Sequence, residues 1–211
     1  MNFYQEVTLL PDAEVSLDFL WHKVYQQIHI ALVDNKSAKG TSYVAIAFPE
    51  YGSAGFRLGK KLRLVAEQKS QLEQLNITNW LVRLADYVHI KSIQAVPENT
   101  VPVSYIRQHV KGEKRVLKDM QQKAELWARK SGASVEQCLA DLQKTKPDKH
   151  SRLPFVWMES LHSKESGKQH RPFPLFIKCI QGKLIQAGDF NCYGLSEGSV
   201  DTQLIATVPH F

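Results

Sequence analysis

The chain has 211 residues, of which 43% are hydrophobic, and a formal net charge of +6 at pH 7. This length suits one large domain or two small ones with a substantial hydrophobic core. The N-terminal segment lacks the basic start and apolar core of a signal peptide, and no apolar run approaches the roughly 20 residues that span a bilayer. Three cysteines without a CxxC pair argue against disulfides and structural zinc. We therefore expect a soluble cytoplasmic protein that needs no metal and no other cofactor.

The first hundred residues alternate between strand and helix patterns. Between Leu17 and Leu32, six apolar residues recur with the period of a helix that buries one face. Asp12 and Ser16 precede this segment as candidate helix caps. Further helices are predicted over Lys69–Leu75 and Asn79–Tyr87, and strands over Phe3–Leu10, Ser42–Phe48, Lys61–Glu67 and Val88–Val96.

The order of these segments is strand, helix, strand, strand, helix, strand, which is the ferredoxin-like arrangement. Pro97 and Pro102 bracket the segment ENTVP, which predicts a linker that closes the first domain near residue 100. We therefore expect an α+β protein with a ferredoxin-like domain over residues 1–100. An α/β RNA-binding domain with a basic helix is expected over residues 101–211.

The second half opens with a basic segment. Residues 107–130 contain eight basic and three acidic residues, a net charge of +5 out of +6 for the whole chain. On a helix, spacings of three and four residues form one continuous stripe, which suits a polyphosphate backbone. The alternative interpretation is a solvated helix face whose cations have acidic partners. The basic stripe consists of Lys111, Lys114, Arg115, Lys118 and Gln122.

The remainder of the second half is less regular. A second helix is predicted over Ser134–Gln143, followed by the polar hinge KTKPDKH. Strands over Leu153–Met158 and Phe173–Ile180 flank a loop rich in Ser, His and Lys. Phe190–Ser196 is predicted as a short strand that runs into a glycine turn.

Three places could carry chemistry. His29 lies beside the apolar face of the first helix, and a half-buried imidazole can transfer protons near neutral pH. Ser160 and Ser163 lie in the loop between two predicted strands, and Tyr193 precedes Gly194. Each also has a structural interpretation: a histidine that completes the core, hydroxyls of a solvated loop and an aromatic residue that packs at a strand end.

Several segments, taken together, resemble one protein family. The chain resembles the CRISPR-associated repeat-processing endoribonucleases of the type I-F system, the Csy branch. The resemblance covers nearly the whole chain, and the CYGLS segment together with a histidine near position 29 carries most of it. The matching segments are IHIALV at 28–33, FP at 48–49, RLGKKLR at 57–63, LPFV at 153–156, the Ser160 loop, FPLFI at 173–177 and FNCYGLS at 190–196.

The resemblance implies a substrate, a reaction and a set of site residues. Members of the family bind a stem-loop of the CRISPR precursor RNA, cut at the base of the stem without a metal and leave a cyclic phosphate. The mature guide RNA stays bound within a type I-F surveillance complex, whose other subunits are the implied partners. The implied catalytic residues are His29, Ser160 and Tyr193. The implied RNA-binding residues are Arg107, His109, Lys111, Lys114, Arg115, Lys118, Gln122 and Phe173.

Two other functions remain open from the sequence. The same fold could serve as a non-catalytic subunit that binds hairpin RNA, although such a protein has no use for the three catalytic residues. A generic ferredoxin-like RNA-binding module would carry an RNP-type aromatic motif, which is missing. His109 stands where the family commonly has Gln, so we expect the recognised repeat sequence to differ from that of better-known members.

Overall fold

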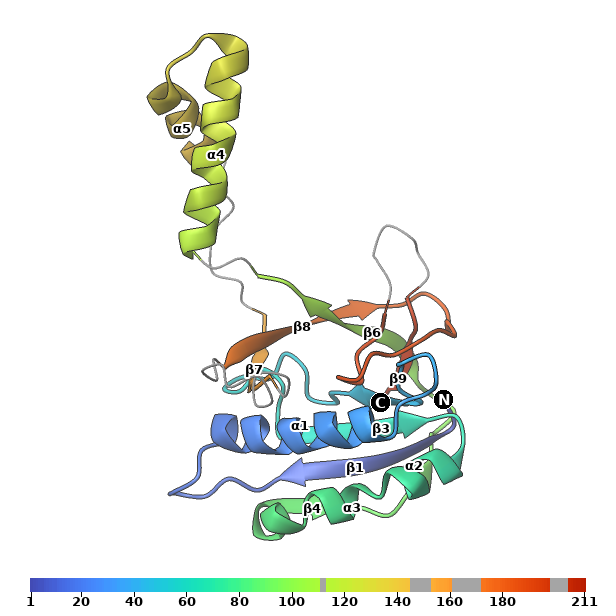
Figure 1. Cartoon of the computed structure of the whole chain (residues 1–211). Helices are drawn as coiled ribbons and strands as arrows, with labels where there is room; N and C mark the ends of the chain where they lie inside the picture. The colour runs from blue at the N-terminus through green and yellow to red at the C-terminus, as the bar shows by residue number, and fades with distance from the viewer. Residues whose placement is uncertain (111–112, 145–152, 161–171, 198–204) are drawn as a thin grey trace. The chain divides into compact units, whose positions relative to one another are not determined.

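The computed structural model describes residues 1–110, 113–144, 153–160, 172–197 and 205–211. The chain divides into two compact units (Figure 1). The first unit comprises Met1–Gln108 and Leu153–Phe211, and the second comprises His109–Arg152. Whether residues 1–100 and 101–211 fold as separate domains stays a prediction. No helix in the described part of the chain is long and apolar enough to cross a membrane.

A ferredoxin-like sheet forms the first half of the larger unit, as the sequence predicts. The strand order is β2-β3-β1-β4, and every neighbouring pair is antiparallel. The short strand β5 also pairs antiparallel with β1. The elements are β1 (Phe3–Leu9), α1 (Leu17–Asp34), β2 (Val44–Ala47), β3 (Lys61–Ala66), α2 (Lys69–Leu75), α3 (Ile77–Trp80), the 3₁₀ helix η1 (Val82–Tyr87), β4 (Val88–Ile90) and β5 (Gln94–Ala95).

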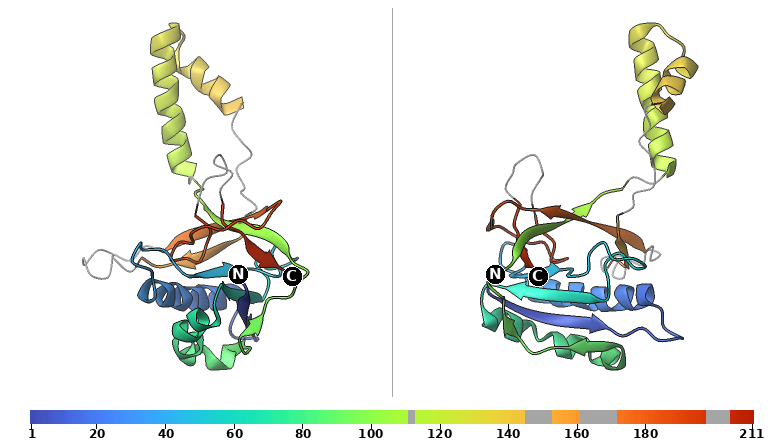
Figure 2. Two further views of the ribbon diagram at one scale, coloured as in Figure 1. Left: turned by 90° about the vertical axis from the view of Figure 1, so that its right-hand side faces the viewer. Right: turned by 180° about the vertical axis from the view of Figure 1, so that it is seen from behind.

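A second, four-stranded antiparallel sheet completes this unit. Its strand order is β7-β8-β6-β9. One hydrophobic core includes buried residues from both sheets and from α1, among them Trp21, Tyr25 and Tyr105. Figure 2 shows the two sheets from two further directions. The strands are β6 (Val101–Gln108), β7 (Phe155–Met158), β8 (Phe173–Gln181) and β9 (Val208–His210).

Strand β6 corrects one prediction. The predicted linker ENTVP is partly wrong, because Val101 and Pro102 already belong to the strand. Pro102 lies opposite Pro209 of β9. Because proline has no amide hydrogen and is uncommon within strands, these two residues hide the pairing in the sequence. Arg107 belongs to the same strand, opposite Ile177, and so lies before the basic helix.

Two further predicted elements differ in detail. The predicted helix Asn79–Tyr87 is two short pieces: α3 ends at Trp80, and η1 follows from Val82 with a kink at Leu84, whose backbone angles are non-helical. The predicted strand Phe190–Ser196 is a turn closed by a single antiparallel bridge between its two end residues. This turn carries Tyr193 and therefore matters for the site.

The second unit is a pair of helices, α4 (Glu113–Ser131) and α5 (Val135–Lys144), and it confirms the predicted basic helix. Met120, Ala124 and Cys138 form its buried seam, whereas Arg115, Lys118 and Gln122 are exposed. Lys111 and the side chain of Lys114 lie outside the described residues. The described residues of the basic stripe are therefore exposed on α4 and are not part of the buried contact between α4 and α5.

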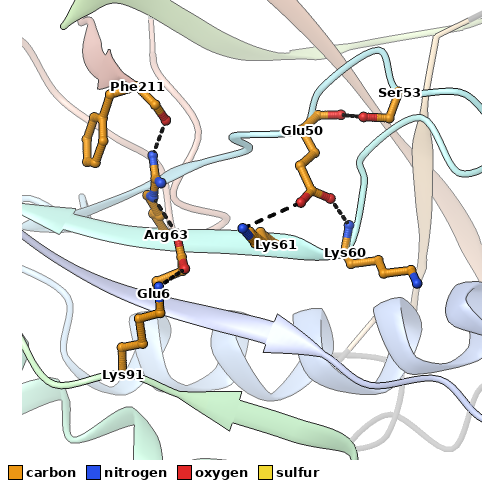
Figure 3. Close-up of polar contacts among 8 residues, drawn as sticks. All are labelled: Glu6, Glu50, Ser53, Lys60, Lys61, Arg63, Lys91 and Phe211. Carbon is orange, nitrogen blue, oxygen red and sulfur yellow. Dashed lines mark hydrogen bonds and ion pairs between the residues drawn. The ribbon is translucent and has the colours of Figure 1, made fainter. Parts of the chain in front are cut away.

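The two ends of the chain meet at one polar cluster (Figure 3). Glu6, only 2% exposed, pairs with Arg63 at 2.9 Å and with Lys91 at 2.8 Å. Burial raises the pKa of the Glu6 carboxyl, but the hydrogen bonds and charges of Lys91 and Arg63 outweigh burial and hold it below its usual 4.5. Arg63 also donates to the carbonyl of Phe211 and lies over its ring. The same view shows Glu50 accepting from the backbone amide of Lys60.

Candidate active site

His29 lies half-buried in the last part of α1, where its ring meets the turn after β8. Its Nδ1 is 2.8 Å from the carbonyl oxygen of Cys192. Because a carbonyl oxygen only accepts, Nδ1 carries the hydrogen and Nε2 is the unprotonated nitrogen of the neutral ring. Burial lowers the pKa of His29 below its ordinary 6.5, and the bond to Cys192 opposes this only partly. At neutral pH the imidazole is therefore neutral, and its Nε2 is free to accept a proton.

Tyr193 stacks on this imidazole. The two ring centroids are 4.3 Å apart and the ring planes differ by 9°. Tyr193 also contacts Arg107. The guanidinium carbon of Arg107 lies 5.4 Å from the centroid of the Tyr193 ring and 5.5 Å from the centroid of the Phe173 ring. A row of stacked groups thus runs from His29 through Tyr193 and Arg107 to Phe173. It joins α1, the 190–196 turn, β6 and β8.

The backbone of Tyr193 is fixed by its own turn and by α1. The side chain of Asn191 accepts from the Tyr193 amide at 2.9 Å, and the Tyr25 hydroxyl donates to the Tyr193 carbonyl at 2.9 Å. Gly194 has φ +70°, and a Cβ atom there would lie 2.5 Å from Cγ1 of Ile46. Only glycine fits this left-handed position against β2. The glycine of the CYG segment is therefore required by backbone geometry.

Ser160 lies two residues beyond the end of β7 and is half-buried. The residue before it, Glu159, is hydrogen-bonded through its backbone to Gln26 of α1. Ser163, the alternative serine, lies outside the described residues.

The remaining predicted RNA-binding residues belong to the second unit. Arg115, Lys118 and Gln122 follow one another on an exposed face of α4, and His109 is exposed at the start of this unit. Among the sequence-predicted residues, the structure brings His29, Tyr193, Arg107 and Phe173 into contact within the first unit.

Three residues of the site were not predicted: Tyr25, Gln26 and Asn191. Gln26 is the one polar residue among the eight buried residues of α1, three residues before His29. Such a residue needs hydrogen-bond partners, and this requirement was a usable signal. Asn191 three residues before a glycine is typical turn chemistry, and this pattern also pointed to the turn.

The side chains that meet at this site are aromatic and basic. Among the described residues there is no group of three or more His, Cys, Asp or Glu side chains that could hold a metal ion. The groups that the structure places here are an imidazole, a phenol, a guanidinium and a phenyl ring. They are suited to proton transfer and to contacts with phosphates and bases.

The described structure is thus an α+β protein with a ferredoxin-like sheet, a half-buried histidine and an exposed basic helix. Residues 4–211 match the family described as CRISPR-associated protein (Cas_Csy4). The chain therefore belongs to this family, and the resemblance inferred from the sequence is confirmed.

Two curated relatives cover almost the same length. A protein named CRISPR-associated endonuclease Cas6/Csy4 from Escherichia coli (strain UTI89 / UPEC) is 28% identical over 218 residues, covering 100% of both chains. A protein of the same name from Pseudomonas aeruginosa (strain UCBPP-PA14) is 31% identical over 204 residues, covering 94% of this chain and 97% of its own.

Proposed function

We propose that this protein is a metal-independent endoribonuclease that binds the stem-loop of CRISPR repeat RNA and cleaves the precursor transcript at the base of the stem. The observation that carries the proposal is the neutral imidazole of His29, stacked on Tyr193 with Nε2 unprotonated. The endonuclease names of two full-length relatives support the same activity. After cleavage, the protein stays bound to the guide RNA within a type I-F surveillance complex.

The reaction uses the RNA's own 2′-hydroxyl as nucleophile. Nε2 of His29 accepts the 2′-hydroxyl proton while the 2′ oxygen bonds to the adjacent phosphorus and the bond from phosphorus to the 5′ oxygen breaks. The products are a 2′,3′-cyclic phosphate and a 5′-hydroxyl, whose oxygen takes a proton from water, while His29 returns its proton to the solvent. An intramolecular nucleophile requires only proton transfer and in-line geometry. DNA lacks the hydroxyl, so the substrate is RNA.

The other residues of the site position the RNA. Arg107 reads a base at the bottom of the stem, Phe173 stacks under the terminal base pair, and Ser160 and Tyr193 orient the ribose and the phosphate. Arg107 and Phe173 already contact each other, so a base pair placed on Phe173 lies beside the guanidinium. The basic stripe on α4 supplies the phosphate contacts along the stem, because its described cations are exposed.

The test is cleavage of the repeat hairpin from the protein's own CRISPR locus in the presence of EDTA, with sequencing of both product ends. We expect a single cut at the stem base, a cyclic phosphate and a 5′-hydroxyl. A hairpin with a 2′-deoxy nucleotide before the cut must bind but remain intact. Activity that appears only with added Mg²⁺ contradicts the mechanism, and tight binding without any cleavage identifies a hairpin-binding subunit instead.

A further inference from the structure

Two polar side chains of helix α1, His22 and Gln26, bind the chain segment that leads from β7 to Ser160. We propose that Gln26 is a positioning residue, which sets Ser160 in register with His29 by binding the peptide backbone immediately before Ser160. The inference rests on the proposed function, because it assigns Gln26 a role in the cleavage step.

Gln26 makes a two-point contact with Glu159. The backbone amide of Glu159 donates to Oε1 of Gln26 at 2.9 Å, and Nε2 of Gln26 donates to the carbonyl oxygen of Glu159 at 3.4 Å. A glutamine amide offers one acceptor and a donor side by side, so it pairs with a residue's N–H and C=O as a neighbouring strand does. The side chain is only 9% exposed. The contact therefore fixes both position and orientation of the backbone that enters Ser160.

The same face of α1 carries a second such contact one turn earlier. Nδ1 of His22 lies 2.7 Å from the carbonyl oxygen of Trp157, and its Nε2 lies 3.5 Å from Oε1 of Glu159. Positions 22, 26 and 29 are spaced by four and three residues and so form one row along the helix. His22 and Gln26 hold the end of β7, and the next position in the row is His29.

Because α1 is a regular helix, the distance between Gln26 and His29 along its axis is fixed. Gln26 and His29 are separated by about 4.5 Å along the helix axis, at about 1.5 Å per residue. One peptide unit separates the Gln26 contact from Ser160. The backbone that enters Ser160 and the residue that carries the imidazole, His29, are therefore both positioned by the same part of one helix. This gives the buried amide at position 26 a purpose that an apolar residue cannot fulfil.

The test compares Gln26→Met, which keeps the side-chain length but removes both hydrogen bonds, with Gln27→Met as the matched control. Gln27 is the next residue of α1 and lines a different cleft with Trp80 and Arg83. Single-turnover cleavage of the repeat hairpin, hairpin affinity and thermal stability are measured for each variant. Small displacements of reacting groups cost up to about 100-fold in rate. We expect Gln26→Met to slow cleavage by about 10- to 100-fold with affinity changed less than about twofold, and Gln27→Met to match the wild type.

A double-mutant cycle with Ser160→Ala separates positioning from a general loss of stability. If Gln26 acts through Ser160, Gln26→Met causes no further slowing once the hydroxyl is gone. The same fold loss in both backgrounds overturns the inference, as does an unchanged rate for Gln26→Met. If Gln26→Met does not fold, Gln26→Glu keeps the acceptor for the Glu159 amide, and we expect its loss of rate to disappear likewise in the Ser160→Ala background.

The outcomes also distinguish this inference from the proposed function. A wild-type protein that cleaves while Ser160→Ala is unimpaired leaves the endoribonuclease standing and overturns the role of Gln26. A wild-type protein that binds but never cleaves overturns both.

Discussion

Replacement of His29 by alanine is the most direct test of the proposed chemistry. The change removes the nitrogen that takes the 2′-hydroxyl proton, and loss of a general acid or base typically costs about 10²- to 10⁴-fold in rate. At about 1.36 kcal/mol per factor of ten, this is roughly 2.7 to 5.4 kcal/mol of transition-state stabilisation. The variant also loses one hydrogen bond to Cys192 and one stack on Tyr193. Those contacts contribute roughly 1 to 3 kcal/mol to stability, less than the free energy of unfolding of a typical domain.

The folded variant should therefore bind but not cut. Tyr193 keeps its backbone bonds to Asn191 and Tyr25. We expect hairpin affinity within about threefold of the wild type and single-turnover cleavage slower by at least about 100-fold. His89→Ala removes the same side chain from an exposed position on β4 and serves as the control. An equal loss of binding and cleavage refutes the assignment and makes His29 a contact or structural residue.

The pH dependence of the wild-type rate gives a second readout of the same residue. Because burial lowers the pKa of His29, the base form is fully present at neutral pH and is lost only as the pH falls through that lowered pKa. The cleavage rate should be flat near pH 7 and fall about tenfold per pH unit on the acidic side. In His29→Ala this acidic limb should be absent. A wild-type rate that already declines between pH 8 and pH 7 contradicts a neutral His29.

Three further predictions concern binding and stability. Arg115→Ala combined with Lys118→Ala should weaken binding to every stem sequence. Filter binding across a salt series should show the slope of log K against log salt reduced in magnitude by roughly 1.4 to 1.8. An unchanged slope means that the stripe is only a solvated helix face. Arg107→Ala should relax the preference at the stem base by about 1 to 3 kcal/mol, measured with matched and base-swapped hairpins, whereas a uniform loss indicates only a phosphate contact. Glu6→Gln should cost about 3 kcal/mol in urea unfolding at pH 7, because it removes the buried carboxylate that pairs with the largely buried Arg63. Glu73→Gln, in an exposed pair, should cost less than about 1 kcal/mol. The Glu6 contribution is present above pH 4.5 and is lost as the pH falls through the lowered pKa, so the two proteins should converge in acid.

Periodicity predicted the elements that bury a continuous face. Helix α1 could be predicted because its apolar residues recur with helical spacing. The buried strand β2 could be predicted because an apolar run ends at a proline. Strand β6 was missed because Pro102 imitates a linker and because Arg107 was assigned to the basic segment that follows. Strand β9 has three residues, one of them Pro209, and becomes a strand only through its pairing with β6. No local pattern contains that long-range information.

The candidate site shows a similar division. His29, Tyr193, Arg107 and Phe173 were selected by resemblance, and the structure shows that they are in contact; their roles stay predictions. The sequence contained no sign that Arg107 approaches the tyrosine, since the residues are 86 positions apart. The turn that carries Tyr193 meets β6 through a hydrogen bond from the Ser196 amide to the Tyr105 carbonyl. Gln26 was missed because a polar residue within an amphipathic helix is usually assumed to face water.

The contact between His29 and Cys192 spans 163 residues and has a consequence for the order of events during synthesis. The α4–α5 pair is held by contacts close in sequence, which generally form faster than contacts between distant segments. The row of His29, Tyr193 and Arg107 requires the turn at 190–196, which is synthesised after both helices. A nascent chain therefore contains its cationic helix before it has a complete imidazole–phenol pair. Under the proposed function, a chain interrupted between these two points carries the basic stripe but cannot cleave a transcript.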